Sequence, residues 1–274
     1  GTLSIDNLVE LAHKYKIRAL GLTDINNSSG VPDFVKACLN AGIKPITGIE
    51  FHRDNKLLYV GLARNREGMR ELNELLSWHN LNNEPLPERP EKLANCFIVY
   101  PFTGRPGFSL RDHEWIGIRM RETRKIISSE FKNNQKKLIL LHPVTFQDTE
   151  GYTLHRNLRA IDHNTLLSKL SGYQIADPGE RFWPLNEMKE ALRDYPRIIQ
   201  NTIMVTGLCE MEFDFKLVKN KQTFTGNRRD DIQLLEKLCR DGVKYRYGNN
   251  NKEAEERIRR EVDIITKLGF AAYF

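Results

Sequence analysis

Two acidic residues near the beginning of the chain each follow an apolar run. Asp24 lies in residues 21–27, GLTDINN, and Glu50 lies in residues 45–51, PITGIEF. In a parallel α/β sheet or barrel, ligands gather where the strands end at their carboxyl edge. We therefore expect metal or substrate chemistry at Asp24 and Glu50, because carboxylates are ligands for divalent cations.

A second group of candidate residues is basic. Arg119, Arg121, Arg124 and Lys125 lie within seven positions of one another, where they could contact phosphates or an acidic subunit. An exposed helix start with solvated charges is the alternative. His155, Asp162 and His163 could suggest a metal site, but their spacing of seven and eight residues along a predicted helix argues against a ligand set.

Composition limits the classes of function. The chain has 274 residues, of which 40% are hydrophobic and 28% charged, as in soluble globular proteins. Its net charge of +6 permits an anionic partner such as nucleic acid, while 36 acids against 42 bases also fit an ordinary solvated surface. No apolar run reaches the roughly 20 residues that span a bilayer. The four cysteines form no CxxC pair, so we expect neither a zinc finger nor disulfides, and a cytoplasmic location.

The elements that must position these residues alternate between strand and helix. Ser4 can cap a first helix, and Asn65 can cap another over residues 66–78. Pro32 suits the first turn of a helix that Gly42 ends. A hairpin over residues 54–55 is predicted to join two strands. The strands themselves are predicted at residues 19–22, 46–51, 57–62, 97–100, 115–119 and 138–141.

Alternating β and α elements favour a parallel sheet or barrel. A further helix is expected over residues 123–131. After Pro143 the pattern becomes mainly helical, with helices predicted at residues 154–170, 185–193, 197–209, 231–247 and 252–268. Residues 212–227 are predicted to be an extended connector. We therefore place a boundary near residue 205, giving domains at 1–205 and 206–274.

Three motifs give the chain a family resemblance. Residues 23–27, TDINN, resemble a TDHGN-like motif, and residues 48–50, GIE, resemble a GxE-like motif. Residues 259–274 resemble the approach to a polymerase palm. Together they resemble the PHP (polymerase and histidinol phosphatase) domain in the version that opens the alpha subunits of bacterial DNA polymerase III, which are C-family replicative polymerases.

The resemblance implies a fold and a function. It implies a PHP-type distorted (β/α)7 barrel followed by a mainly helical segment, and DNA-templated DNA synthesis by the full-length protein. The catalytic aspartates, with Mg²⁺, would then lie beyond residue 274. The implied partners are DNA, the proofreading exonuclease subunit and the sliding clamp, with no membrane.

The same resemblance implies a degenerate metal site. Ile25 stands where the TDH motif has its histidine, and Pro143 and Thr145 stand where a later motif has an acid and a histidine. The family's His-x-His pair would precede Gly1. Asp24 and Glu50 are thus residual positions, and Zn²⁺ or Mn²⁺ binding is not expected. The domain would act mainly in support and subunit docking.

Two other functions stay open from the sequence. One is a metal-dependent phosphoesterase or 3′–5′ exonuclease of the PHP superfamily, which the loss at Ile25 weighs against. The other is a binding module whose basic surface contacts DNA directly. A steep salt dependence of DNA binding would distinguish the second from the first.

Overall fold

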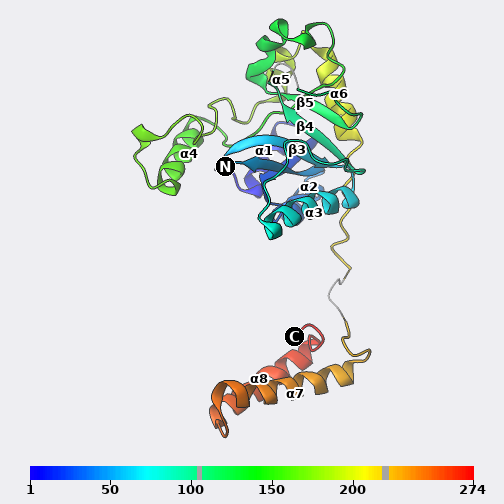
Figure 1. Ribbon diagram of the computed structural model, residues 1–274, viewed down its shortest axis with the longest axis vertical. Helices are drawn as coiled ribbons and strands as arrows, with labels where there is room; N and C mark the ends of the chain where they lie inside the picture. Colours follow the sequence, from blue (N-terminus) through cyan, green and yellow to red (C-terminus); the bar gives the residue numbers. More distant parts are fainter. Residues whose placement is uncertain (104–106, 218–221) are drawn as a thin grey trace. The chain divides into compact units, whose positions relative to one another are not determined.

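A curled six-stranded sheet forms the centre of the fold in a computed structural model that describes residues 1–103, 107–217 and 222–274 (Figure 1). The strands follow one another across the sheet in chain order. They are β1 (Ala19–Ile25), β2 (Lys44–Arg53), β3 (Lys56–Ala63), β4 (Cys96–Pro101), β5 (Glu114–Ile118) and β6 (Leu138–Leu140). The predicted α/β class is confirmed, with six strands in the described residues where the resemblance implied seven.

The sheet is mixed rather than parallel throughout. β1 pairs in parallel with β2, and β4, β5 and β6 are parallel neighbours, while β3 is antiparallel to both β2 and β4. The predicted hairpin between β2 and β3 explains this inversion. Asp54 and Asn55 have φ of 52° and 61°, the left-handed conformation that a two-residue hairpin turn requires. The hairpin prediction is confirmed.

Three helices pack against one face of the sheet: α1 (Ile5–Lys14), α2 (Val31–Asn40) and α3 (Arg66–Asn82). Ser4 and Asn65 cap α1 and α3, as predicted, by accepting the backbone N–H groups of Asn7 and Gly68. Helix α3 runs beyond its predicted end at residue 78 and stops at Asn83, whose φ is +53°. Their apolar faces bury a core against β2 and β3 that includes Phe34, Leu72, Ile49, Phe51 and Tyr59.

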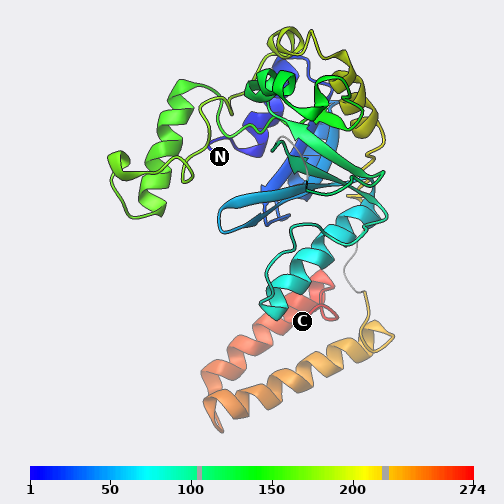
Figure 2. The same ribbon diagram turned by 45° about the horizontal axis from the view of Figure 1, so that its top comes forward.

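The later part of the sheet is covered by α5 (Leu185–Ala191) and α6 (Pro196–Gly207), whereas α4 (Thr149–Asp162) projects to one side of the sheet (Figures 1 and 2). Helix α4 begins and ends earlier than predicted. Asp148 caps its first turn, and Asn164, with φ of +46°, ends the helical path well before residue 170. Val205 of α6 and the following Cys209 join a second apolar cluster on the other face of the sheet.

The helix predicted over residues 123–131 is wrong. The chain there forms two 3-10 segments, η1 (Met120–Ser128) and η2 (Glu130–Lys132). The hydroxyls of Ser128 and Ser129 donate to the carbonyls of Lys125 and Ile126, so they compete with the backbone N–H groups for those acceptors. The extended backbone of Ser129 separates the two segments.

The described chain divides into two compact units, Gly1–Phe213 and Asp214–Phe274. The division lies after the proposed boundary near residue 205, because Cys209 and Met211 still pack in the core of the first unit. The second unit is a hairpin of α7 (Arg228–Tyr247) and α8 (Lys252–Leu268), joined around a small core of Leu235, Val262 and Ala271. Part of the predicted connector, residues 218–221, lies outside the described residues.

Candidate functional site

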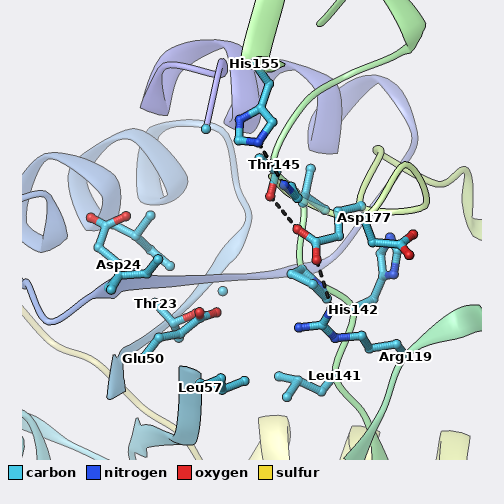
Figure 3. A pocket seen from close by; sticks show the side chains of 18 of the residues that line it. Thr23, Asp24, Glu50, Leu57, Arg119, Leu141, His142, Thr145, His155 and Asp177 are labelled. Carbon is cyan, nitrogen blue, oxygen red and sulfur yellow. Dashed lines mark hydrogen bonds and ion pairs between the residues drawn. The ribbon is translucent and has the colours of Figure 1, made fainter. Parts of the chain in front are cut away.

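A large cleft opens in the first unit at the carboxyl ends of β1 and β2. Its volume is about 1800 Å³, and its other walls come from residues 141–145 and 172–183 (Figure 3). Leu57 and Leu141 form an apolar part of the lining, while Glu50, Arg119 and His142 present polar groups (Figure 3). The cleft therefore lies where parallel strands gather ligands.

Glu50 is held at the end of β2 by two side chains. The Thr23 hydroxyl donates to its Oε1 at 3.3 Å, and its Oε2 lies 3.1 Å from Nε2 of His52. Asn26 fixes this edge: its side-chain amide accepts from the backbone N–H of His52 and donates to the His52 carbonyl, each at 2.9 Å. The register of β2 shifts between Phe51 and His52, and the contact between the two side chains shows that Glu50 and His52 lie on the same side of the strand.

Asp24 and Glu50 do not come together. In the parallel pairing of β1 with β2, Ile25 is opposite Glu50 and Asp24 is opposite Ile49. Side chains alternate along a strand, so the two carboxylates lie on opposite faces of the sheet. Asp24 Oδ2 instead lies beside Gly30, 3.3 Å from where a Cβ would stand. Figure 3 shows the two carboxylates pointing away from each other.

The environment of Asp24 disfavours its charged form. Burial raises the pKa of Asp24 and the charge of Glu50 adds to the effect, against the chain's amino terminus, which lowers it. Its side chain faces α1 and α2 rather than the group around Glu50. The two residual ligand positions, Asp24 and Glu50, therefore share no face of the sheet.

Arg119 and Glu180 form an ion pair in the cleft. Nη1 of Arg119 lies 2.9 Å from Oε1 of Glu180, whose side chain is only 13% exposed. The Thr145 hydroxyl donates to the other carboxylate oxygen at 2.7 Å. Burial raises the pKa of Glu180, which Arg119 and Thr145 oppose and the charge of Glu50 reinforces. Sequence reasoning missed Glu180, because its segment has no motif.

The histidines of the cleft are held by backbone groups. Nε2 of His142 lies 3.0 Å from the carbonyl of Arg181, so it donates its proton there and leaves Nδ1 as the acceptor. His155 accepts the backbone N–H of Ala176 at its Nε2, at 2.9 Å. Burial lowers the pKa of both imidazoles. Both rings are therefore neutral at pH 7.

The remaining candidates do not converge on the cleft centre. Arg159 pairs with Asp162 at 2.6 Å and contacts His163 Nε2 at 2.7 Å, so both residues have a protein partner. In the basic run, Arg121 pairs with Asp177 and Lys125 pairs with Glu122. Arg124 is exposed.

The described residues do not fit the metal centre of His and carboxylate ligands that an active PHP domain would have. In residues 1–103, 107–217 and 222–274, no group of three His, Cys, Asp or Glu side chains is placed to hold an ion. Glu50 already has Thr23 and His52 as partners, and Glu180 is paired with Arg119. Ile25, on the same face as Glu50, contributes no donor atom. A cation would have to displace contacts that already exist.

Comparison with known proteins gives the family context. Residues 1–98 match the model of the PHP domain family. The chain is 27% identical over 306 aligned residues to the DNA polymerase III subunit alpha of Halalkalibacterium halodurans, covering 98% of this chain and 27% of that protein. It is 23% identical to the error-prone DNA polymerase of Symbiobacterium thermophilum and 24% identical to the DNA polymerase III subunit alpha of Neisseria meningitidis, covering 100% of this chain and 30% and 28% of those proteins.

The first part of this chain, residues 1–98, is similar to the PHP domain family, and it lies in a unit of the α/β class. The chain as a whole is a relative of DNA polymerase III alpha subunits and spans 27–30% of the length of these three relatives. No helix in the described residues is both long and apolar enough to cross a membrane.

Proposed function

We propose that this chain is the PHP-containing part of a bacterial replicative DNA polymerase of the DNA polymerase III alpha type. The full-length protein would synthesise DNA on a DNA template, with Mg²⁺ at aspartates beyond residue 274. The observation that supports this is the extent of the similarity. It covers 98–100% of the chain and so continues past the PHP match at residue 98, through the second unit.

Within that polymerase, we assign the PHP domain a supporting and docking role. The polar side chains of its cleft mostly bind one another, as in the Thr23–Glu50–His52 and Thr145–Glu180–Arg119 groups. Such groups stabilise a fold but leave few free donors or acceptors for a substrate. The proofreading exonuclease subunit and the sliding clamp are the proposed protein partners, and the cytoplasm is the proposed location.

The first experiment is to determine the size of the native gene product by immunoblot with an antibody raised against this chain. A band several times larger than 31.9 kDa, with primer extension by the purified product in Mg²⁺, is the expected result. A band near 31.9 kDa without primer extension would contradict the polymerase assignment.

A second candidate function is metal-dependent phosphoester hydrolysis or 3′–5′ exonuclease activity in the cleft itself. The observation in its favour is that Glu50, His52 and the acceptor nitrogen of His142 line one cleft. It predicts release of phosphate from p-nitrophenyl phosphate, or of nucleotides from a DNA 3′ end, when Mn²⁺ or Zn²⁺ is added.

The control for hydrolysis is a matched pair of variants. Glu50→Gln should abolish true turnover, whereas Glu88→Gln, an exposed acid on the surface, should leave it unchanged. Turnover that neither substitution alters would come from a contaminant. The absence of turnover with either metal would eliminate this candidate.

The basic run remains a candidate contact for nucleic acid or an acidic subunit. Arg124 is the residue to change first, because it is exposed while Arg119, Arg121 and Lys125 are in ion pairs. If the run binds phosphates, Arg124→Gln should weaken DNA binding and reduce its salt dependence by about one counterion. Unchanged binding and salt slope would count against the contact.

A further inference from the structure

The cleft concentrates negative charge in its interior. Glu50 and Glu180 are both largely buried, with side chains 19% and 13% exposed, and the charge of Glu50 helps to raise the pKa of Glu180. Two carboxylates in a partly desolvated cleft repel each other unless a positive charge lies nearby. His142 and His155, the neutral imidazoles of the cleft, do not provide that charge. His52 contacts Glu50 at 3.1 Å, so Glu180 is the carboxylate that needs a cation from elsewhere in the cleft.

Arg119 is placed to supply it. Its side chain leaves the end of β5 and extends into the cleft, as Figure 3 shows. Its Nη1 contacts Glu180 at 2.9 Å, and its own side chain is 38% exposed. A guanidinium stays protonated at all ordinary pH values and is less strongly hydrated than an ammonium group. It can therefore hold its charge in a site that is partly closed to water.

Arg119 also links separate parts of the chain. Glu180 lies on residues 177–183, and the backbone of this segment bonds residues 145 and 146: Thr145 N–H donates to the Glu180 carbonyl at 2.8 Å. Phe182 N–H donates to the Phe146 carbonyl at 3.1 Å. The Arg119–Glu180 pair thus ties the start of η1 to the far wall of the cleft.

We propose that Arg119 is the built-in cation of this cleft, neutralising Glu180 and holding the 177–183 segment in place, so that this wall of the cleft needs no bound metal ion. The inference goes beyond the polymerase assignment, since it concerns how the PHP cleft is stabilised. It rests on the geometry of the ion pair, the burial of both carboxylates and the engagement of their oxygens by Thr23, His52 and Thr145.

The test compares Arg119→Gln with Arg121→Gln. Arg121 is a matched control because it lies two residues away and pairs with Asp177 of the same segment at 2.8 Å, but both partners are about half exposed. Thermal unfolding of the full chain is followed in EDTA and in 1 mM Mn²⁺ or Zn²⁺. In EDTA, Arg119→Gln should lower Tm by roughly 4–8 °C, and Arg121→Gln by about 2 °C or less.

The response to metal is the more specific measurement. The unmodified chain and Arg121→Gln should show no metal-dependent rise in Tm. Arg119→Gln leaves the Glu180 carboxylate without its cation and should regain part of its lost Tm when Mn²⁺ or Zn²⁺ is added. Arg119→Lys keeps the charge and should remain insensitive to metal.

Two results would overturn the proposal. One is a rise in the Tm of the unmodified chain on adding metal that equals the rise for Arg119→Gln, because a metal would then bind beside the arginine. The other is a decrease in Tm in EDTA for Arg119→Gln that is no larger than the decrease for Arg121→Gln. If Arg119→Gln does not fold, Mn²⁺ is titrated by calorimetry into the unmodified chain and into Arg119→Lys. Stoichiometric binding to both proteins would overturn the proposal. The absence of binding to both would support it.

Discussion

Glu114 is a buried charge, and we expect its removal to be costly. It opens β5 with a side chain that is fully buried, and it has several donors around it. Nε and Nη2 of Arg89 lie 2.9 Å and 2.5 Å from its two oxygens, the Tyr100 hydroxyl donates at 3.1 Å, and the Arg111 backbone N–H donates at 2.7 Å. Glu114 thus connects β4, β5 and the segment around Arg89.

The perturbation is Glu114→Gln, which keeps the shape but removes the charge and turns one acceptor oxygen into an N–H donor. Breaking one member of a buried ion pair costs about 3–5 kcal/mol. We expect the lower end, about 3 kcal/mol, because the side chain of Arg89 is 26% exposed and can regain water. For a unit of this size that corresponds to a fall in Tm of roughly 6–12 °C.

The assay is urea unfolding followed by circular dichroism, with Glu88→Gln as the control. Glu88 also pairs with an arginine, Arg53, at 3.0 Å, but its side chain is 75% exposed, so its loss should cost less than about 1 kcal/mol. A loss for Glu114→Gln within about 1 kcal/mol of that for Glu88→Gln would refute the reasoning that burial makes this pair costly to break.

The pH dependence of the same variant provides a second check. Burial by itself would raise the pKa of Glu114, but the hydrogen bonds from Arg89, Arg111 and Tyr100 hold it below its ordinary value of 4.5. A carboxyl with a lowered pKa in the fold stabilises it fully above the unfolded pKa, and this contribution falls as the pH drops through the folded pKa. The stability difference between the unmodified chain and Glu114→Gln should therefore shrink below pH 4.5.

Three further predictions concern the backbone, a helix cap and a histidine. Gly48→Ala should destabilise the chain severely, because the new Cβ would lie 2.1 Å from the Gly61 carbonyl oxygen. The control, Gly21→Ala, should be tolerated, because the nearest atom to its Cβ would be 4.0 Å away. Equal Tm values for the two variants would contradict this prediction. Asn65→Ala should cost about 1 kcal/mol in urea unfolding through loss of the α3 cap. Burial lowers the pKa of His155 in the fold, so the unfolded state takes up its proton first and stability should fall as the pH drops below 6.5. His155→Gln should reduce the fall in Tm between pH 7.5 and 5.5, and an unchanged fall would count against this account.

Local sequence patterns predicted many of the elements well. Ser4 and Asn65 cap their helices, and Asp54 and Asn55 form the predicted turn, because these features depend on a few neighbouring residues. Helix α8 occupies its predicted bounds, Lys252–Leu268. The helix expected over residues 123–131 failed, because the side chains of Ser128 and Ser129 compete for backbone carbonyls, which apolar spacing does not reveal.

The candidate site was predictable only in part. The carboxyl ends of β1 and β2, where the sequence predicts a site, border the cleft. His52 could have been found as well. It is two positions after Glu50, and side chains two positions apart on a regular strand point to the same face. Glu180 could not, since it is 130 residues from Glu50 along the chain and lies in a segment with no motif.

By itself, the sequence determined the α/β class, most of the elements and the resemblance to the PHP domain of replicative polymerases, because each depends on residue types and local spacing. Only the tertiary structure decided which charged groups meet. The strand register puts Asp24 and Glu50 on opposite faces of the sheet, and long-range folding brings Arg119 to Glu180. A one-residue difference in register moves a side chain to the other face, and the residue types alone do not specify it.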